Sequence, residues 1–328
     1  MGSTFGELFR RHPSNPILTI DDWPYPANSV FNAASVQFDN RTLLLVRVED
    51  RRGISHLTVA KSADGVSNWD IDPKPTFPAD PKNHPEELWG VEDPRITFVP
   101  ENGEYLIAYT AYSECGPLVS LARTRDFRKF ERLGPIMPPE DKDAALFPVK
   151  FNGRWAMIHR PYGLVSEIVP AHMWMSFSPD LKHWGDTRIL MRARQGGWWD
   201  ANRIGLSPPP METPLGWLIL YHGVRKTAAG AIYRIGAALL DRDDPTIIIR
   251  RSNEWIFSPQ ETYERIGDVG DVVFSCGWVC AGDRVRLYYG AADTAIALAE
   301  ASLSELLDHL TALPEYCNDV NNAGFTKK

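Results

Sequence analysis

Charged and polar residues follow or precede short apolar segments at five places along the chain. These are Arg47-Val48-Glu49-Asp50, Glu92-Asp93-Pro94-Arg95, His159-Arg160-Pro161, Tyr221-His222-Gly223 and Ala291-Ala292-Asp293. Carboxylates can transfer protons, and arginines can hold an anion through paired hydrogen bonds. One such group is more often a salt-bridged strand end than a site. Five groups spread along the chain favour a shared polar pocket.

Asp93 has the strongest local case for a catalytic role. Pro94 disfavours helical geometry in the residue before it, so we expect Asp93 in an extended segment. Arg95, two residues further on, would then face the same side and could orient or acidify the carboxylate. An Asp-Pro turn with an ion pair explains this local sequence equally well. Asp93 is therefore a candidate general acid with a structural alternative.

The elements that must position these residues are predicted to be strands. Short segments rich in β-branched and aromatic residues are typical of strands, and helical periodicity is confined to residues Leu303 to Leu310 near the C-terminus. The clearest predicted strands are Thr42–Val48, Tyr105–Tyr109, Trp155–His159, Trp217–Tyr221 and Val285–Tyr289.

A turn signature recurs about every 60 residues. Ser62-Ala63-Asp64-Gly65 leads to Trp69, Thr124-Arg125-Asp126-Phe127 to Phe130, and Ser178-Pro179-Asp180-Leu181 to Trp184, with a fainter copy at Leu240–Pro245. The Ser/Thr and Asp oxygens can cap a tight turn, so each copy indicates one hairpin. The repeat predicts an all-β fold, a five-bladed β-propeller with a short C-terminal helix, in which residues 1–328 form one domain. A β-sandwich or jelly roll gives no reason for this period.

Composition narrows the function classes. The net charge of −7 and the absence of charge blocks argue against nucleic acid as a partner. No apolar run is long enough to span a membrane, and the charged N-terminal segment lacks a secretory signal pattern, so a cytoplasmic location is expected. The oligomeric state, monomer or homo-oligomer, stays open.

Metal and disulfide chemistry are not expected. Cys115, Cys276, Cys280 and Cys317 show no paired CxxC spacing and are interpreted as buried free thiols. The eight histidines include no HxH or HxxxH pattern. We predict no metal site and no cofactor.

Ordered motifs along nearly the whole chain resemble the inverting β-mannoside phosphorylases of glycoside hydrolase family 130. They are Asn15-Pro16-Ile17-Leu18, Asn28–Asn32, Gly90–Arg95, Asp143–Pro148, Asn152-Gly153-Arg154, His159-Arg160-Pro161, Gly216-Trp217-Leu218, Tyr221–Val224, Gly267-Asp268-Val269 and Tyr288–Thr294. This family has a five-bladed propeller fold, in agreement with the repeat.

The resemblance implies roles for individual residues. Asp93 would be the general acid, acting through the 3-hydroxyl of the bound mannosyl unit, and inorganic phosphate would be the co-substrate, giving α-mannose 1-phosphate with inversion. The implied sugar-binding residues are Asn28, Ser29, Arg47 and Asp293. The implied phosphate-binding residues are Arg160, Arg203, His222 and Tyr233.

Two alternatives accompany this reading. An inverting β-mannosidase needs a second carboxylate as base about 6.5–9.5 Å from the acid, and Glu264 or Asp268 could serve. A phosphorylase needs no base because its nucleophile is already an anion, and the implied set of cationic and hydrogen-bonding residues suits that reaction. The two arginines also have a purely structural explanation: Arg160 and Arg203 could simply pair with acids at strand ends, which would leave no anion site. A non-catalytic sugar-binding propeller is the third reading.

The chain departs from the family pattern at two points. Val149 stands where some phosphorylases have an arginine that touches phosphate, and Val269-Gly270-Asp271-Val272 replaces a Val-Pro-Asn-Val run, so the contacts at both places are in doubt. We expect the linkage and acceptor to be set by loops 72–88, 162–171 and 192–199. The run Gln195–Asp200, with Trp198 and Trp199, is interpreted as an acceptor-side aromatic platform, and the resemblance favours β-1,2-mannobiose over β-1,4-linked substrates.

Overall fold

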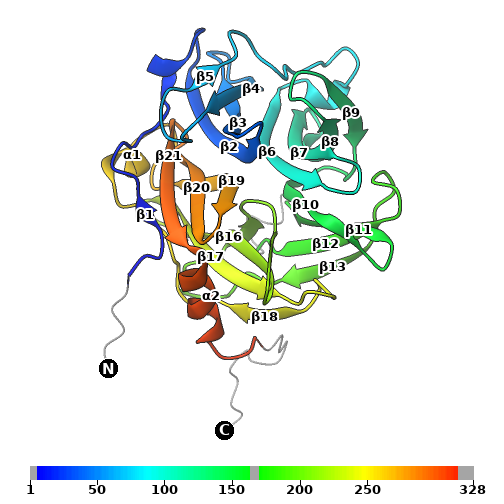
Figure 1. Cartoon of the computed structure of the whole chain (residues 1–328), viewed down its shortest axis with the longest axis vertical. Coiled ribbons are helices and arrows are strands. Elements are labelled where there is room, and N and C mark those ends of the chain that lie inside the picture. Colours follow the sequence, from blue (N-terminus) through cyan, green and yellow to red (C-terminus); the bar gives the residue numbers. More distant parts are fainter. Residues whose placement is uncertain (1–5, 163–169, 317–328) are drawn as a thin grey trace.

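A computed structural model describes residues 6–162 and 170–316, whose strands form five antiparallel sheets around a central axis (Figure 1). The predicted five-bladed β-propeller is confirmed. Blade 1 consists of β2 (Ser29–Phe38), β3 (Arg41–Glu49), β4 (Ser55–Ser62) and β5 (Asp70–Ile71). Blade 2 consists of β6 (Val91–Val99), β7 (Glu104–Ser113), β8 (Gly116–Thr124) and β9 (Phe130–Pro135). Blade 3 consists of β10 (Asp141–Phe151), β11 (Arg154–Pro161), β12 (Met173–Ser178) and β13 (Gly185–Met191).

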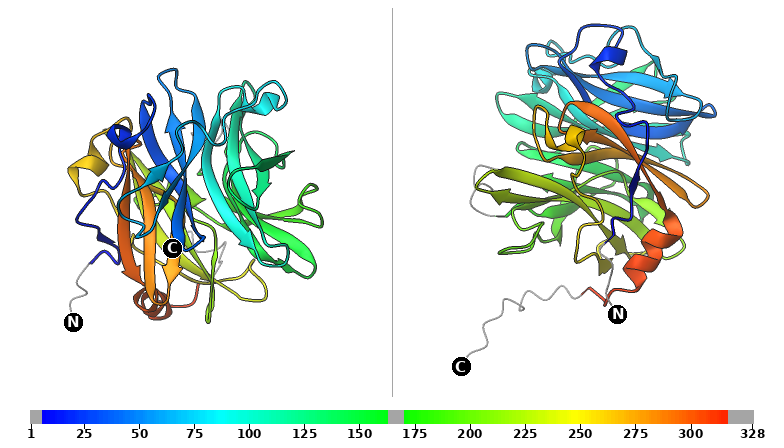
Figure 2. Two further views of the ribbon diagram at one scale, coloured as in Figure 1. Left: turned by 45° about the horizontal axis from the view of Figure 1, so that its top comes forward. Right: turned by 90° about the vertical axis from the view of Figure 1, so that its left-hand side faces the viewer.

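The ring of blades is closed by the N-terminal strand. Blade 4 consists of β14 (Arg203–Leu206), β16 (Gly216–Thr227), β17 (Gly230–Leu240) and β18 (Ile248–Arg251), with β15 (Met211–Thr213) beside β16. Blade 5 takes β19 (Val273–Ala281), β20 (Arg284–Ala291) and β21 (Ala295–Ser302) from the C-terminal part and β1 (Arg10–Arg11) from the N-terminal part. The pairing of Arg10 with Glu300 and of Arg11 with Ala299 therefore joins the two ends of the chain in one sheet (Figure 2).

The predicted turn signature lies between the third and fourth strands of blades 1 to 4. In each turn one aspartate oxygen accepts hydrogen bonds from two backbone N–H groups that follow it, at Asp64, Asp126, Asp180 and Asp241. Blade 5 needs no such turn because β1 supplies its outer strand. The interpretation of one such hairpin per blade is confirmed for blades 1 to 4 and is wrong for blade 5, whose outer strand comes from the N-terminal segment.

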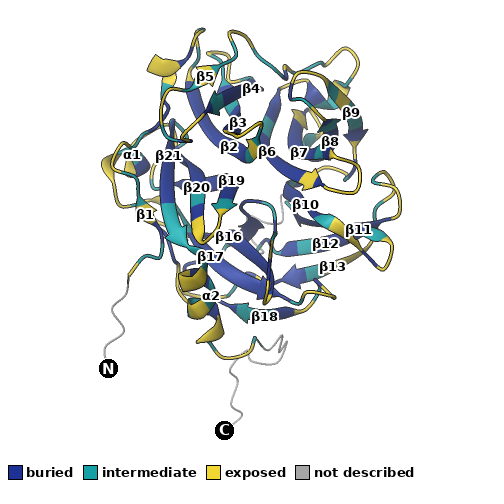
Figure 3. Cartoon of the chain, in the orientation of Figure 1, coloured by how far each residue is buried: buried dark blue, intermediate teal, exposed yellow. Residues whose placement is uncertain are grey.

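The hydrophobic core is divided among the five interfaces between neighbouring blades. In β3, Leu43 and Leu45 pack toward blade 2, whereas Leu44 and Val46 pack toward blade 5. A strand that is buried on both faces has no polar side, which explains the continuous apolar runs in the sequence. Figure 3 shows the resulting buried strands within a more exposed rim of turns and helices.

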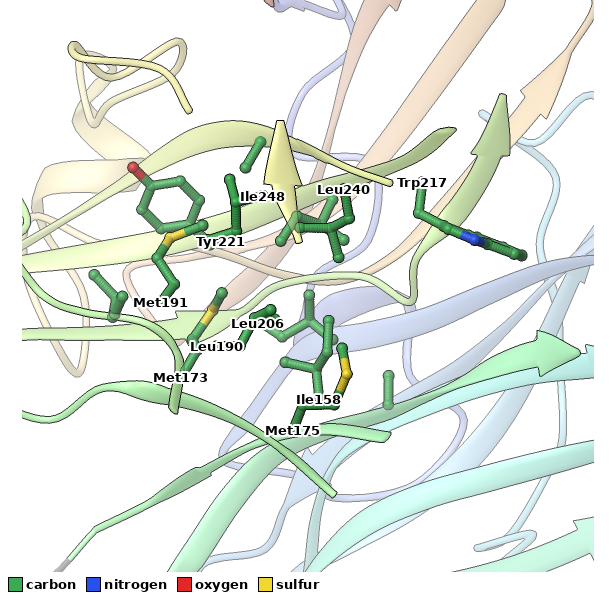
Figure 4. Close-up of a cluster of buried hydrophobic side chains, with 14 of the residues drawn as sticks. Ile158, Met173, Met175, Leu190, Met191, Leu206, Trp217, Tyr221, Leu240 and Ile248 are labelled. Carbon is green, nitrogen blue, oxygen red and sulfur yellow. The ribbon is translucent and has the colours of Figure 1, made fainter. Parts of the chain in front are cut away.

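The interface between blades 3 and 4 illustrates this packing (Figure 4). Met173 and Met175 of β12 lie in one cluster with Leu206, Leu240 and Ile248 of blade 4. Unbranched methionine side chains fill irregular gaps between sheets that do not share a regular register. Packing of this kind fixes each blade against its neighbours, and therefore fixes the inner strand ends relative to one another.

The predicted C-terminal helix is confirmed as α2 (Leu303–Thr311), and a short α1 (Thr262–Arg265) precedes blade 5. Ser302 caps α2, since its hydroxyl accepts a hydrogen bond from the N–H of Glu305. Leu306 and Leu310 bury the apolar side of the helix against the cluster between blades 4 and 5. The helix therefore covers an outer edge of the propeller.

Candidate active site

A cavity of about 470 Å³ opens where the inner strands of all five blades meet. Each of the five strand-end groups predicted to share a pocket contributes at least one residue to it. The lining residues are Asn32, Arg47, Glu92, Asp93, Tyr112, Gly116, Pro117, Glu140, Lys142, Asp143, Arg160, Tyr162, Arg203, His222, Tyr233, Val269, Val272, Phe274 and Asp293. A concave site with convergent charged groups is the usual setting for ligand binding and catalysis.

β-Bulges aim three of these residues at the cavity. The pairing register shifts at Asn32 in β2, at Asp93 in β6 and at Asp143 in β10. The three residues have φ values of 47°, 47° and 54°, in the left-handed region that Asn and Asp tolerate better than other side chains. The expected extended conformation of Asp93 is therefore wrong, because the bulge overrides the preference imposed by Pro94.

Two hydrogen bonds hold the Asp93 carboxylate. Its Oδ1 accepts from Asn32 Nδ2 at 2.9 Å and from Arg47 at 3.0 Å. Burial alone would raise the pKa of Asp93, but the charges of Arg47 and Lys142 and the bond from Asn32 outweigh it and lower that pKa. In the ligand-free protein Asp93 is thus an ionised, firmly positioned carboxylate.

Arg95 does not contact the Asp93 carboxylate, contrary to expectation, although its charge contributes to the lowered pKa of Asp93, as expected. Its guanidinium is buried and donates to the backbone carbonyls of Asp93, Leu206 and Ser207, and it pairs with Asp143 at 3.5 Å. The alternation of side chains along a strand fails across the bulge, which sends Arg95 away from the carboxylate. Arg95 therefore fixes the backbone of Asp93 and ties blade 2 to blade 4.

Asp293 is a second carboxyl group in the same cavity, with the opposite shift. Burial raises the pKa of Asp293 to about 7, against an opposing effect of the Arg47 charge, and the nearby Asp93 carboxylate adds to the rise. Two carboxyl groups with pKa values pushed in opposite directions are typical of acid–base sites. Of these two carboxyl groups, Asp293 therefore keeps its proton to the higher pH.

Arg160 and Asp143 form a buried ion pair on the blade 3 side of the cavity. Arg160 donates through Nε at 2.7 Å and approaches the same carboxylate oxygen through a terminal nitrogen at 2.6 Å. Its other terminal nitrogen, Nη1, is buried without a hydrogen-bond partner among the described residues. The expected alternative, that Arg160 pairs with a strand-end acid, is correct for this contact, but the pairing leaves one donor of the guanidinium available.

His222 and the aromatic rings complete the wall next to Arg160. Burial lowers the pKa of His222, and although Asp143 opposes this shift from 3.3 Å, we expect a neutral imidazole. The ring lies 4.7 Å from Phe274 and 6.1 Å from Tyr233 between centroids. Gly205 makes this possible, because a Cβ there would lie 2.5 Å from His222 Cε1 and still closer to Asp143.

Arg203 lies on the same side of the cavity as His222. Its guanidinium is 5.4 Å from the ring centroid of Tyr162 and 5.9 Å from that of Tyr233. A guanidinium between aromatic rings is held by cation–π contacts that leave its edge available for hydrogen bonds. The four residues predicted to bind phosphate are thus gathered on blades 3 and 4.

Of the four predicted sugar-binding residues, Arg47 and Asp293 line the cavity, whereas Asn28 and Ser29 do not. Asn28 is exposed and donates to Asp268 at 3.0 Å. Ser29 is buried at the start of β2. The structure brings the other predicted residues together without these two.

Lys142 is a cavity residue that the sequence analysis did not single out. Its ammonium lies 3.6 Å from Glu92. Burial lowers the pKa of Lys142, but the charges of Glu92 and Asp93 outweigh this effect, so the pKa is raised overall. Lys142 precedes Asp143 at the third bulge. At Asn32 and Asp143 the polar residue is followed by two alanines, a pattern that could have located these two bulges, whereas Asp93 is followed by Pro94 and Arg95 and lacks this signal.

The predicted aromatic platform lies outside the cavity. Trp199 is buried against Gly223 and Gly236, and its indole N–H donates to Asn253. Trp198 is exposed but lines a separate hollow with Trp255. The interpretation of Gln195–Asp200 as an acceptor platform of this cavity is therefore wrong, and loop residues 163–169 lie outside the described part of the chain.

Neither predicted hydrolase base lines the cavity. Glu264 is fully buried in α1 and bound by Arg11 at 2.8 and 2.9 Å and by Tyr289 at 2.7 Å. Asp268 is exposed and paired with Asn28. Glu264 is a structural residue, because its oxygens are taken up by these partners and by two backbone N–H groups.

The two departures from the family pattern differ in position. Val149 is exposed and does not line the cavity, whereas Val269 and Val272 do. Asp271, between those valines, pairs with Arg265 at 3.2 Å. The segment 269–272, which departs from the family pattern, therefore borders the cavity through the apolar side chains of Val269 and Val272.

The cysteine interpretation holds only in part. Cys276 is buried and Cys280 half-buried, but Cys115 is exposed, and Cys317 lies outside the described residues. Within residues 6–162 and 170–316, no group of three or more His, Cys, Asp or Glu side chains is arranged to hold a metal ion. In that same part of the chain, no helix is long and apolar enough to cross a membrane.

Comparisons with known proteins match this architecture. A family model of glycoside hydrolase family 130, described as beta-1,4-mannooligosaccharide phosphorylase, matches residues 9–312. Beta-1,2-mannobiose phosphorylase of Listeria innocua is 39% identical over 257 residues, which cover 78% of this chain and 69% of that protein. Beta-1,4-mannooligosaccharide phosphorylase of Ruminococcus albus is 34% identical over 313 residues, covering 93% and 91%.

A solved structure agrees with the sequence matches. The Listeria innocua beta-1,2-mannobiose phosphorylase in complex with β-1,2-mannobiose superposes with a TM-score of 0.84 at 31% identity, covering 93% of this chain and 99% of that one. Because the family model spans most of the chain and the relatives exceed 30% identity over more than two thirds of it, the chain belongs to glycoside hydrolase family 130.

Proposed function

We propose that this protein catalyses inverting phosphorolysis of a β-mannoside, releasing α-mannose 1-phosphate and a shortened acceptor. An oxygen of inorganic phosphate forms a bond to the anomeric carbon while the bond from that carbon to the glycosidic oxygen breaks. Asp93 gives its proton to the 3-hydroxyl of the mannosyl unit, which passes its own proton to the leaving oxygen. No metal or cofactor takes part in this scheme.

The observation that carries the proposal is the gathering of Arg160, Arg203, His222 and Tyr233 on one side of a cavity that also holds Asp93. A phosphate anion needs positive charge and several donors that fix it for in-line attack. The unpartnered Nη1 of Arg160 is one such donor. The Tyr233 hydroxyl is a second group suited to phosphate oxygens.

Arg47 and Asp293 are proposed to bind the mannosyl unit beside Asp93. Arg47 connects three carboxylates, donating to Glu92 at 3.0 Å as well as to Asp93 and lying 3.7 Å from Glu49. Asn28 and Ser29 would join this subsite only through a movement of their segment at the rim. A cytoplasmic location remains part of the proposal and is open to test by cell fractionation.

Hydrolysis by an inverting β-mannosidase is the second candidate, and the cavity bears on it directly. Asp143 is already held by Arg160, and Glu92 by Arg47, so neither carboxylate is free to deprotonate water. Glu264 and Asp268, the two carboxylates predicted as hydrolase bases, lie outside the cavity. Glu140 does line the cavity and has one oxygen without a partner among the described residues, so it is the group that a hydrolase could use as base. The gathering of Arg160 and Arg203 in the same cavity supports the anionic nucleophile over water.

The test incubates the purified protein with β-1,2-mannobiose and with β-1,4-mannobiose, each with and without inorganic phosphate. We expect α-mannose 1-phosphate only when phosphate is present, and no turnover by Asp93→Asn, because an amide cannot donate the proton. Equal release of free mannose with and without phosphate would establish a hydrolase instead. Binding of either disaccharide without turnover by the wild type would support a sugar-binding module.

A further inference from the structure

One wall of the cavity has no role in the scheme so far. Tyr112, Gly116 and Pro117 come from the hairpin between β7 and β8, and Glu140 directly precedes β10. These residues lie on blades 2 and 3, outside the inner strands that supply Asp93 and Asp143. The wall therefore continues the cavity outward from the proposed catalytic centre.

Tyr112 is a firmly held aromatic residue at this wall. Its backbone N–H donates to Gly90 at 3.1 Å, and its carbonyl accepts from Trp89 at 2.8 Å. The Trp89 ring meets the Tyr112 ring edge to face, with centroids 5.3 Å apart. Tyr112 retains 37% exposure and Trp89 42%, so apolar ring surface stays open next to the cavity. Rings of this kind stack against the C–H faces of sugars while the phenol group forms hydrogen bonds.

Glu140 brings a carboxylate to the same wall. Its Oε2 is buried without a hydrogen-bond partner among the described residues. Leaving a buried carboxylate oxygen unpaired is unfavourable, and a small rotation of the side chain would let it accept a ligand hydroxyl. Gly116 permits this position, since a Cβ there would lie 3.0 Å from Glu140 Cγ in a backbone with φ of 90°.

We propose that Tyr112 and Glu140 bind the acceptor sugar, the unit that leaves when the mannosidic bond breaks. This inference rests on the proposed function. In-line attack places phosphate and the leaving group on opposite sides of the anomeric carbon. Phosphate is assigned to four residues of blades 3 and 4, whereas Tyr112 shares blade 2 with Asp93, whose proton must reach the leaving oxygen. Glu140 precedes β10 of blade 3, but its side chain lies against Gly116 of blade 2, which places the carboxylate beside the Tyr112 hairpin. The specificity for the acceptor is thus assigned to this wall and not to the Trp198 and Trp199 run.

The test is the reverse reaction, synthesis of a β-mannoside from α-mannose 1-phosphate and mannose as acceptor. For Glu140→Gln we expect the KM for the acceptor to rise about 10- to 100-fold, the range for loss of a hydrogen bond to a charged group. Tyr112→Ala removes the ring that stacks against the sugar, so its acceptor KM should rise about 10-fold. The KM for α-mannose 1-phosphate should change less than threefold. Trp198→Ala is the matched control, and its acceptor KM should equal that of the wild type.

Each outcome decides one question. A rise in the KM for α-mannose 1-phosphate instead of the acceptor KM, or a larger acceptor effect in Trp198→Ala, would overturn the assignment of this wall. Absence of any synthesis by the wild type would refute the proposed function itself and not the wall alone. Thermal unfolding of both variants checks their folding, and the exposed Tyr112 provides a second variant should Glu140→Gln be unstable.

Discussion

Replacing Gly205 with alanine should disturb the proposed phosphate site through a single added carbon. The new Cβ would lie 2.5 Å from Cε1 and 2.6 Å from Nε2 of His222, and closer still to Asp143, whereas ordinary contact begins near 3.4 Å. His222 or Asp143 must therefore move by about 1 Å, a misplacement that costs on the order of 100-fold in rate when it affects reacting groups. We expect kcat/KM for phosphate to fall by about that factor.

The assay follows α-mannose 1-phosphate release at varied phosphate, alongside thermal unfolding. Overpacking of a tight site costs about 1–3 kcal/mol, so Tm should fall by roughly 2–10 °C. Gly185→Ala is the control, because a Cβ at Gly185 meets nothing within 4 Å, and it should leave both quantities near wild type. A folded Gly205→Ala variant with an unchanged kcat/KM for phosphate would refute the placement of phosphate beside His222 and Asp143.

Further predictions concern stability. Glu264→Gln should lower the free energy of unfolding by about 3–5 kcal/mol, because it breaks the buried pair with Arg11. The folded variant should keep the kcat of the wild type. A large loss of kcat would instead show that Glu264 takes part in the reaction. Asp293 has a pKa raised from 3.8 to about 7, so the protonated carboxyl stabilises the fold fully below pH 3.8, and this stabilisation is lost as pH rises through 7. The loss is at most about 4 kcal/mol, and the partial exposure of the side chain reduces it. Asp293→Asn should therefore gain Tm over the wild type at pH 8 but not at pH 4, and a gain independent of pH would contradict this shift. Ser302→Ala should lower the free energy of unfolding in urea by about 1 kcal/mol, because it removes the cap of α2, and should leave kcat unchanged. A fall in kcat of the folded variant would link α2 to the site.

Much of the fold could be predicted because local sequence and tertiary packing agree in the second strand of each blade. The five predicted strands lie within β3, β7, β11, β16 and β20, which are apolar on both faces. The two-residue β1 shows the limit. Nothing in Arg10 and Arg11 resembles a strand, and only pairing with β21 makes them one.

The site was predictable where a strand end alone decides which way a side chain faces. Arg47, Arg160 and His222 follow the alternation of their strands into the cavity. Arg95 was misplaced because an unseen bulge shifts the alternation by one residue. Trp199 was misplaced because its burial depends on Gly223 and Gly236, distant glycines whose missing side chains provide the space it fills.

The protonation of Asp93 connects the free protein to the proposed reaction. A general acid must carry a proton, yet Arg47 and Lys142 lower the pKa of Asp93 when the cavity holds no substrate. A bound phosphate adds negative charge near these cations, and a bound sugar displaces water, so both should raise that pKa. Since kcat/KM reports the free protein and kcat the substrate complex, the alkaline fall of kcat should occur at higher pH than that of kcat/KM. If the two profiles fell at the same pH, substrates would leave the pKa of Asp93 unchanged, and Asp293, whose pKa is raised to about 7, would become the better candidate for the acid.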